Sequence, residues 1–205
     1  MRRVISLWLP RFTTDRIASS RPGARDSPLA VVLESRGRRL VVAVNAPAAG
    51  AGITPGMTVA DARAVLPALT TVPADPPRDA AALARLARWC GRYSPWTAVD
   101  DSFTPEAPDG AGALWLDVTG ASHLFGGEDA LCADLIDRLG HTGYDARAAV
   151  AGTPGTAWAA ARFTPGDDDW TIVPAGAERA SVPNELVEET IGALILALDR
   201  MNPLG

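Results

Sequence analysis

The stretch Gly112–Gly120 reads GALWLDVTG and predicts a strand with one well-buried face. Leucine, leucine and valine alternate along it with alanine, tryptophan and aspartate, which is the period of a strand. Thr119 and Gly120 end the strand, and a Gly-Gly pair then precedes an acidic helix start at Glu128. The stretch therefore predicts a half-buried strand that leads through a short turn into a helix.

The composition is that of a soluble globular protein: 205 residues, 47% hydrophobic and 21% charged, enough for one or two cores. The formal net charge of −5 disfavours strong autonomous DNA binding, because such binders usually carry a basic patch. Cys90 and Cys132 show neither pairing nor metal spacing, so we expect buried free thiols. No apolar run approaches the roughly 18–20 residues of a membrane span, and no signal-peptide pattern opens the chain. These features predict a cytoplasmic protein without membrane contact.

Strands and helices follow one another in an order that indicates an α+β fold. Strands are predicted at 4–9, 29–33, 40–45, 97–103, 112–118, 145–151 and 170–173, and helices at 12–19, from Thr58, from about 77 to 90, at 128–139 and at 153–162. Residues 46–56 receive no regular element, and 73–77 are predicted to be a linker. After the first strand, the order from residue 77 onward is that of a split ferredoxin-like fold.

Four ordered motifs carry a family resemblance: RRVISLWLPR (2–11), GMTVADAR (56–63), DVTGASHLFGGE (117–128) and GTPGTAWA (152–159). Together they resemble the Y-family (translesion) DNA polymerases, and within them the polymerase-like ImuB group of bacterial mutasome operons. The resemblance implies a ferredoxin-like palm (1–10 and 76–165), a small inserted fingers subdomain (11–75) and a short helical thumb remnant (166–205).

The same resemblance implies that the catalytic site is lost. Active Y-family enzymes hold metal with an Asp at the end of the first strand and with an Asp-Glu pair, which correspond here to Trp8, Gly112 and Ala113. Their NYxAR segment, which contacts the triphosphate, reads NAPAA here, so Ala46 and Ala49 replace the Tyr and the Arg. The resemblance thus implies a pseudo-polymerase without metal or other cofactor. Trp8 is expected to fill the emptied cleft, mostly buried against the strand that holds Ala113.

Two acidic sites, Asp117 and the pair Asp100-Asp101, are candidates for substitute ligands. Asp117 lies four residues beyond Ala113, about 13 Å along an extended strand. A two-metal site has ions about 3.5–4 Å apart, so Asp117 cannot complete one. The pair Asp100-Asp101 is interpreted as a solvated turn.

A basic cluster at a predicted hairpin tip, Arg36, Arg38 and Arg39, could make weak contacts with a phosphate backbone, although a solvated hairpin tip is the favoured interpretation.

The function implied by the resemblance is a non-catalytic scaffold in damage-induced (SOS) mutagenic translesion synthesis and DNA repair. Its implied partners are a RecA-like mutasome protein and a separate replicative-type polymerase, with DNA bound weakly if at all. The family's sliding-clamp peptide does not occur in this chain. Two alternatives stay open: an active Y-family polymerase with an altered metal site, and a truncated remnant or unrelated interaction module.

Overall fold

The structure is a computed structural model that describes residues 2–21, 23–35, 37–100, 111–164 and 169–177. A five-stranded sheet has the order β5-β6-β1-β7-β8 and a three-stranded sheet the order β3-β2-β4. The first comprises β1 (Val4–Leu9), β5 (Thr97–Val99), β6 (Gly112–Asp117), β7 (Arg147–Ala151) and β8 (Trp170–Ile172). The second comprises β2 (Leu29–Ser35), β3 (Arg38–Val44) and β4 (Thr70–Pro73). The helices are α1 (Phe12–Ser19), α2 (Ala46–Gly50), α3 (Val59–Val65), α4 (Pro76–Cys90), α5 (Glu128–Thr142) and α6 (Pro154–Phe163), with a 3₁₀ turn η1 (Ser122–Phe125).

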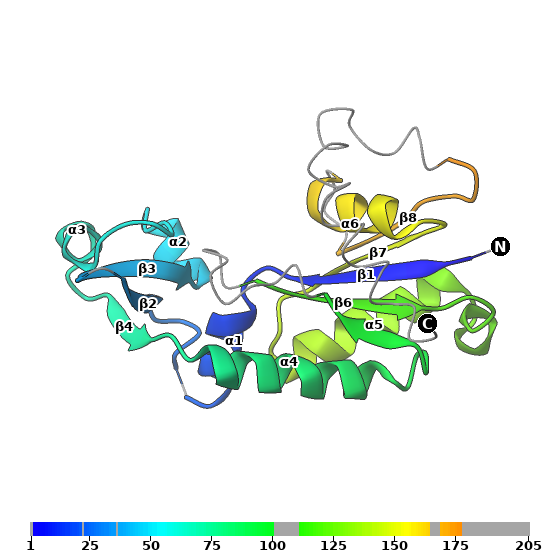
Figure 1. Cartoon of the computed structure of the whole chain (residues 1–205), viewed down its shortest axis with the longest axis horizontal. Coiled ribbons are helices and arrows are strands. Elements are labelled where there is room, and N and C mark those ends of the chain that lie inside the picture. Colours follow the sequence, from blue (N-terminus) through cyan, green and yellow to red (C-terminus); the bar gives the residue numbers. More distant parts are fainter. Residues whose placement is uncertain (1, 22, 36, 101–110, 165–168, 178–205) are drawn as a thin grey trace.

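The larger sheet has the predicted ferredoxin-like arrangement, which we call the palm. Its chain order is β1, α4, β5, β6, α5, β7, and β1 pairs antiparallel with both β6 and β7 at the centre. The edge strand β8 adds parallel to β7. In Figure 1, α4 and α5 cover one face of this sheet and α6 covers the other. The predicted α+β class and palm topology are therefore confirmed.

Both faces of the palm sheet are buried, each against its own helices. On the α4/α5 face, alternate residues of β1 and β6, including Leu7 and Leu114, join Leu83 and Leu135 in the main core. On the α6 face, a smaller cluster consists mostly of alanine and valine side chains packed around the buried Trp115. Period-two alternation therefore separates the core from a second face, and that second face holds the candidate site.

The helix starts follow local side-chain capping. Asp75 accepts a hydrogen bond from the Arg78 N–H at the start of α4, and Thr58 accepts one from the Asp61 N–H at the start of α3. The second contact is the predicted cap at Thr58, and these side chains satisfy backbone donors that a helix start leaves unpaired. Among the described residues, no helix combines the length and apolarity that crossing a bilayer requires.

The smaller sheet lies within residues 11–75, to the left in Figure 1, and corrects two expectations. Residues 46–50 form helix α2, because the Asn45 side chain accepts from the Ala48 N–H and so starts a helix in a segment of weak periodicity. Residues 70–73 form β4 by parallel pairing with β2, a contact that local sequence does not encode. Of the predicted linker 73–77, only residues 74 and 75 lie between elements, because β4 ends at Pro73 and α4 begins at Pro76.

Two further expectations concern the thiols and the tail. Cys90 and Cys132 are both buried and free, as predicted, and burial raises the pKa of each thiol to about 12. Of the predicted thumb remnant, the structure describes residues 169–177, in which β8 joins the palm sheet. Residues 178–205 lie outside the described residues.

Candidate functional site on the palm sheet

The three positions predicted to have lost metal ligands come together in the middle of the palm sheet. Strand register places Trp8 opposite Ala113 and Leu9 opposite Gly112. Side chains alternate along a strand, so Trp8 and Ala113 share the face covered by α6, whereas Gly112 faces α4. The three positions therefore do not lie on the same face of the sheet.

Gly112 lies against the main core. A Cβ atom built on it would be 3.0 Å from Phe12 Cγ and 3.2 Å from Leu83 Cδ1. Such contacts are closer than ordinary van der Waals packing, so any larger side chain requires these core residues to move. The position that the resemblance assigns to a metal-binding Asp is here a site of close backbone packing.

Trp8 packs on the α6 side of the sheet, against the cluster that contains Trp115, and its side chain is intermediate between fully buried and exposed. Ala113 and Trp115 in the neighbouring strand are 4% and 3% exposed. The indole N–H groups of Trp115 and Trp158 are buried and have no hydrogen-bond partner in the described part of the chain. Trp8 is therefore mostly buried and packs beside this strand, as predicted, although a part of the indole stays accessible.

Asp100 corrects the sequence interpretation of a solvated turn. Its backbone N–H donates to the Ala113 carbonyl at 2.9 Å, which extends the pairing of β5 with β6 by one residue. Asp100 is 3% exposed, and the alternation along β5 puts its side chain on the same face as Trp8 and Ala113. Tertiary pairing buried this carboxylate, whereas polarity alone suggested a turn. Asp101 lies outside the described residues.

Arg162 completes this face, and sequence reasoning missed it. Its guanidinium carbon lies 4.4 Å from the centre of the Trp158 ring and 5.5 Å from that of Trp8. Nη1 donates to the Trp158 carbonyl at 3.3 Å and to Ser6 Oγ at 3.5 Å, and Nη2 lies 3.9 Å from Asp100 Oδ2. A signal existed: Arg162 is four residues beyond Trp158 in an alanine-rich helix, a spacing that places both on one helix face.

The donor set on this face does not suit a divalent cation. Mg²⁺ prefers near-octahedral oxygen ligands, usually including carboxylates. Trp8, Gly112 and Ala113 offer no side-chain oxygen, and Asp100 already faces the Arg162 cation. Among the described residues, no group of three or more His, Cys, Asp or Glu side chains is placed to hold a metal ion.

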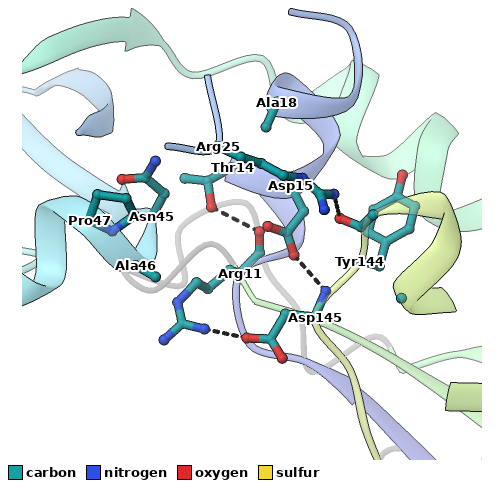
Figure 2. Close-up of a pocket in the computed structure, with 12 residues that line it drawn as sticks. Arg11, Thr14, Asp15, Ala18, Arg25, Asn45, Ala46, Pro47, Tyr144 and Asp145 are labelled. Atoms are coloured by element: carbon teal, nitrogen blue, oxygen red, sulfur yellow. Dashed lines mark hydrogen bonds and ion pairs between the residues drawn. The ribbon is translucent and has the colours of Figure 1, made fainter. Parts of the chain in front are cut away.

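A second feature is a pocket of about 310 Å³ between the smaller sheet and the palm, shown in Figure 2. Its lining includes the predicted nucleotide-contact position Ala46, but not Ala49. From the palm side, Arg11 forms an ion pair with Asp145, whose backbone N–H donates to Asp15 Oδ2 at 3.0 Å. The pocket thus brings together residues that the sequence separates by more than a hundred positions.

Charge in this pocket is balanced between two arginines and two aspartates. Arg25 donates to the Gly143 carbonyl and so ties the loop before β2 to the C-terminal end of α5. Burial raises the pKa of Asp15 to about 6, while the hydrogen bond from Asp145 lowers it and the Asp145 charge raises it. Arg11 and Arg25 are thus both occupied by contacts within the protein, and these contacts join the smaller sheet to the palm.

The remaining predicted positions lie at the periphery. Asp117 accepts from the Thr119 N–H at 3.0 Å and lies 3.5 Å from Arg2, so it stabilises the strand end. Arg38 and Arg39 are exposed at the start of β3, and Arg36 lies outside the described residues.

Comparison with known proteins is consistent with this architecture. Residues 7–162 match the model of the IMS family, described as impB/mucB/samB. Protein ImuB of Caulobacter vibrioides is 46% identical over 131 residues, which cover 64% of this chain and 26% of that protein. The chain thus matches about a quarter of the length of this relative.

Solved structures show the same fold. An insertion ternary complex of Dbh DNA polymerase has a TM-score of 0.69 at 17% identity, covering 93% of this chain and 57% of that one. A Y-family DNA polymerase chimera of Dbh and Dpo4 has a TM-score of 0.63 at 17% identity, covering 86% and 49%. At such identities the likeness concerns the fold alone. The family match, which spans most of the chain, shows that this chain belongs to the impB/mucB/samB family.

Proposed function

We propose that this chain is a non-catalytic, polymerase-like scaffold of the ImuB type that serves damage-induced mutagenic translesion DNA synthesis. The observation that carries the proposal is the pairing of Trp8 with Ala113 and of Leu9 with Gly112 at the centre of the palm sheet. By resemblance, three metal-holding carboxylates belong at Trp8, Gly112 and Ala113, and none of these side chains can bind a cation through oxygen. A chain that keeps this fold without those ligands retains its surfaces and has lost the means of nucleotidyl transfer.

Its partners, by the same resemblance, are a RecA-like mutasome protein and a replicative-type polymerase, which would supply the synthesis. DNA contact is expected to be weak, because the net charge is −5 and the predicted phosphate contacts are few. Binding of the purified chain to a RecA-like protein and to a replicative-type polymerase of the same organism, measured by calorimetry, tests the scaffold role. Failure of the chain to bind either partner would count against that role.

The rival function, an active polymerase with an altered metal site, has one observation in its favour. Asp100 is a buried carboxylate that faces the same space as Trp8 and Ala113. Asp100 Oδ2 lies 3.9 Å from Arg162 Nη2, so this carboxylate already faces a cationic side chain. A single carboxylate in this state is a poor start for a two-metal site.

Primer extension decides between these functions. The purified chain is incubated with a primed template, undamaged or damaged, and with Mg²⁺ or Mn²⁺. Asp100→Asn is the matched control, because it removes the carboxylate that the described residues bury on this face and keeps its shape. We expect no extension by either protein. Extension by the native chain that survives purification away from host polymerases would refute the non-catalytic proposal, and its loss in Asp100→Asn would assign the activity to this face.

A further inference from the structure

Arg162, near the end of α6, makes several contacts with the palm sheet and with its own helix. Aromatic rings lie within 4.4 Å and 5.5 Å of its guanidinium carbon, a carbonyl and a hydroxyl accept from Nη1, and Asp100 faces Nη2. Its side chain is only 13% exposed, and that of Asp100 is 3% exposed. A mobile surface arginine does not have this set of contacts.

Burying the Asp100 carboxylate requires a compensating charge, because an isolated buried ion is strongly destabilising. An arginine meets this need well: its guanidinium stays charged at every relevant pH, is weakly hydrated and stacks on aromatic rings. A divalent cation brought to the same face would meet a positive charge that the rings and Asp100 keep in place.

We propose that Arg162 is a resident cation that takes the place of a divalent metal on this face of the palm sheet. It neutralises Asp100, and it excludes divalent cations even when a carboxylate is restored beside it. The inference rests on the non-catalytic function proposed above and deepens it. The metal site would then differ from an active one in two ways: its carboxylates are replaced, and an arginine side chain supplies a positive charge.

The first test asks whether charge, and not volume, is what Arg162 supplies. Thermal unfolding is compared for the native chain, Arg162→Lys, Arg162→Met, Asp100→Asn and Asp100→Asn with Arg162→Met. We expect Arg162→Met to melt lowest, Arg162→Lys to lose less, and Asp100→Asn to recover part of the loss in the Met background. If Lys and Met cost the same, or Asp100→Asn recovers nothing, the resident-cation role is refuted.

The second test measures cation exclusion. Trp8→Asp places a carboxylate on the same face as Asp100, and Mn²⁺ binding is followed by electron paramagnetic resonance with and without Arg162→Met. We expect Mn²⁺ to bind at least about tenfold more tightly when Arg162 is removed, because a fixed positive charge nearby disfavours a second cation. The addition of Asp100→Asn should abolish the gain. Equal binding with and without Arg162, or binding to neither protein, would overturn the exclusion.

If the variant that combines Trp8→Asp with Arg162→Met does not fold, the melting comparison of the first test decides the role of Arg162. That comparison needs no substitution at Trp8. The outcome is separable from that of the proposed function. Primer extension by the native chain would refute the non-catalytic function whatever Mn²⁺ does in the variants. Failure of the melting and Mn²⁺ comparisons would refute the role of Arg162 and leave the primer-extension result unchanged.

Discussion

Gly112 offers a direct test of whether this palm can accept the carboxylate that the family resemblance assigns there. Its added Cβ would lie 3.0 Å from Phe12 Cγ and 3.2 Å from Leu83 Cδ1, both in the main core. Overpacking of this kind destabilises a protein by about 1–3 kcal/mol. Replacing glycine by alanine also lowers the entropy of the unfolded chain, which offsets up to about 1 kcal/mol of that loss. We therefore expect Gly112→Ala to destabilise the fold by about 1–2 kcal/mol.

Gly112→Asp adds the burial of a carboxylate among apolar side chains, so the expected loss rises to about 3–5 kcal/mol. For a chain of this size, each kcal/mol corresponds to roughly 2–4 °C in melting temperature. Urea unfolding followed by tryptophan fluorescence measures both losses. Gly140→Ala in α5 is the matched control, because its Cβ meets nothing within 4 Å and alanine favours a helix.

Phe12→Leu supplies the internal check. If Phe12 is the obstacle, the smaller side chain should make Gly112→Ala less costly than in the native background, which a double-mutant cycle detects. A Gly112→Asp variant as stable as the native chain would refute the steric argument, and the Asp position would then have to be regarded as open.

Three further outcomes follow from contacts elsewhere in the fold. Because burial raises the pKa of Asp15 from 3.8 to about 6, the folded state binds more protons between these values, so stability should fall as pH rises from about 4 to about 6. Asp15→Asn should flatten that slope in urea titrations at successive pH values, and an unchanged slope would show that Asp15 does not titrate as stated. Arg3 donates to both Glu128 carboxylate oxygens at 2.6 Å, so Arg3→Ala should cost about 2–4 kcal/mol of unfolding free energy. A loss near zero by urea unfolding would mean that solvent screens the pair. DNA binding followed by fluorescence anisotropy should be weak, with a log–log salt slope of about −3 or shallower, and joint Arg38→Glu and Arg39→Glu should abolish it. Sub-micromolar binding at physiological salt would contradict the weak contact.

Elements with strong local signals were predictable from the sequence. The strand before Pro10 and the helix that follows it have the predicted bounds, 4–9 and 12–19, because proline ends a strand and an apolar period identifies a short helix. The Thr58 cap was predictable because one side chain satisfies a nearby backbone donor. Such signals act over a few residues, so no tertiary knowledge is needed to find them.

Elements that depend on distant partners were not predictable. Strand β4 forms by pairing with β2, in a register that joins Thr70 to Leu29, forty-one positions earlier in the sequence. Helix α2 depends on Asn45, whose side chain also binds the Leu29 N–H in another element. Asp100 is polar enough to suggest a turn, and only the hydrogen bond of its backbone to Ala113 placed it in the interior.

The sequence by itself determined which side chains stand at the positions that the resemblance assigns to metal and triphosphate contacts, because the identities of Trp8, Gly112, Ala113, Ala46 and Ala49 are independent of folding. Tertiary structure decided how those positions are arranged and what occupies the space. Strand register turned Gly112 toward the α4 core and Trp8 toward α6, and helix packing brought Arg162 to Asp100 across sixty-two positions of sequence. The physical reason is that side-chain identity is local, whereas register and charge pairing form only when distant segments pack together.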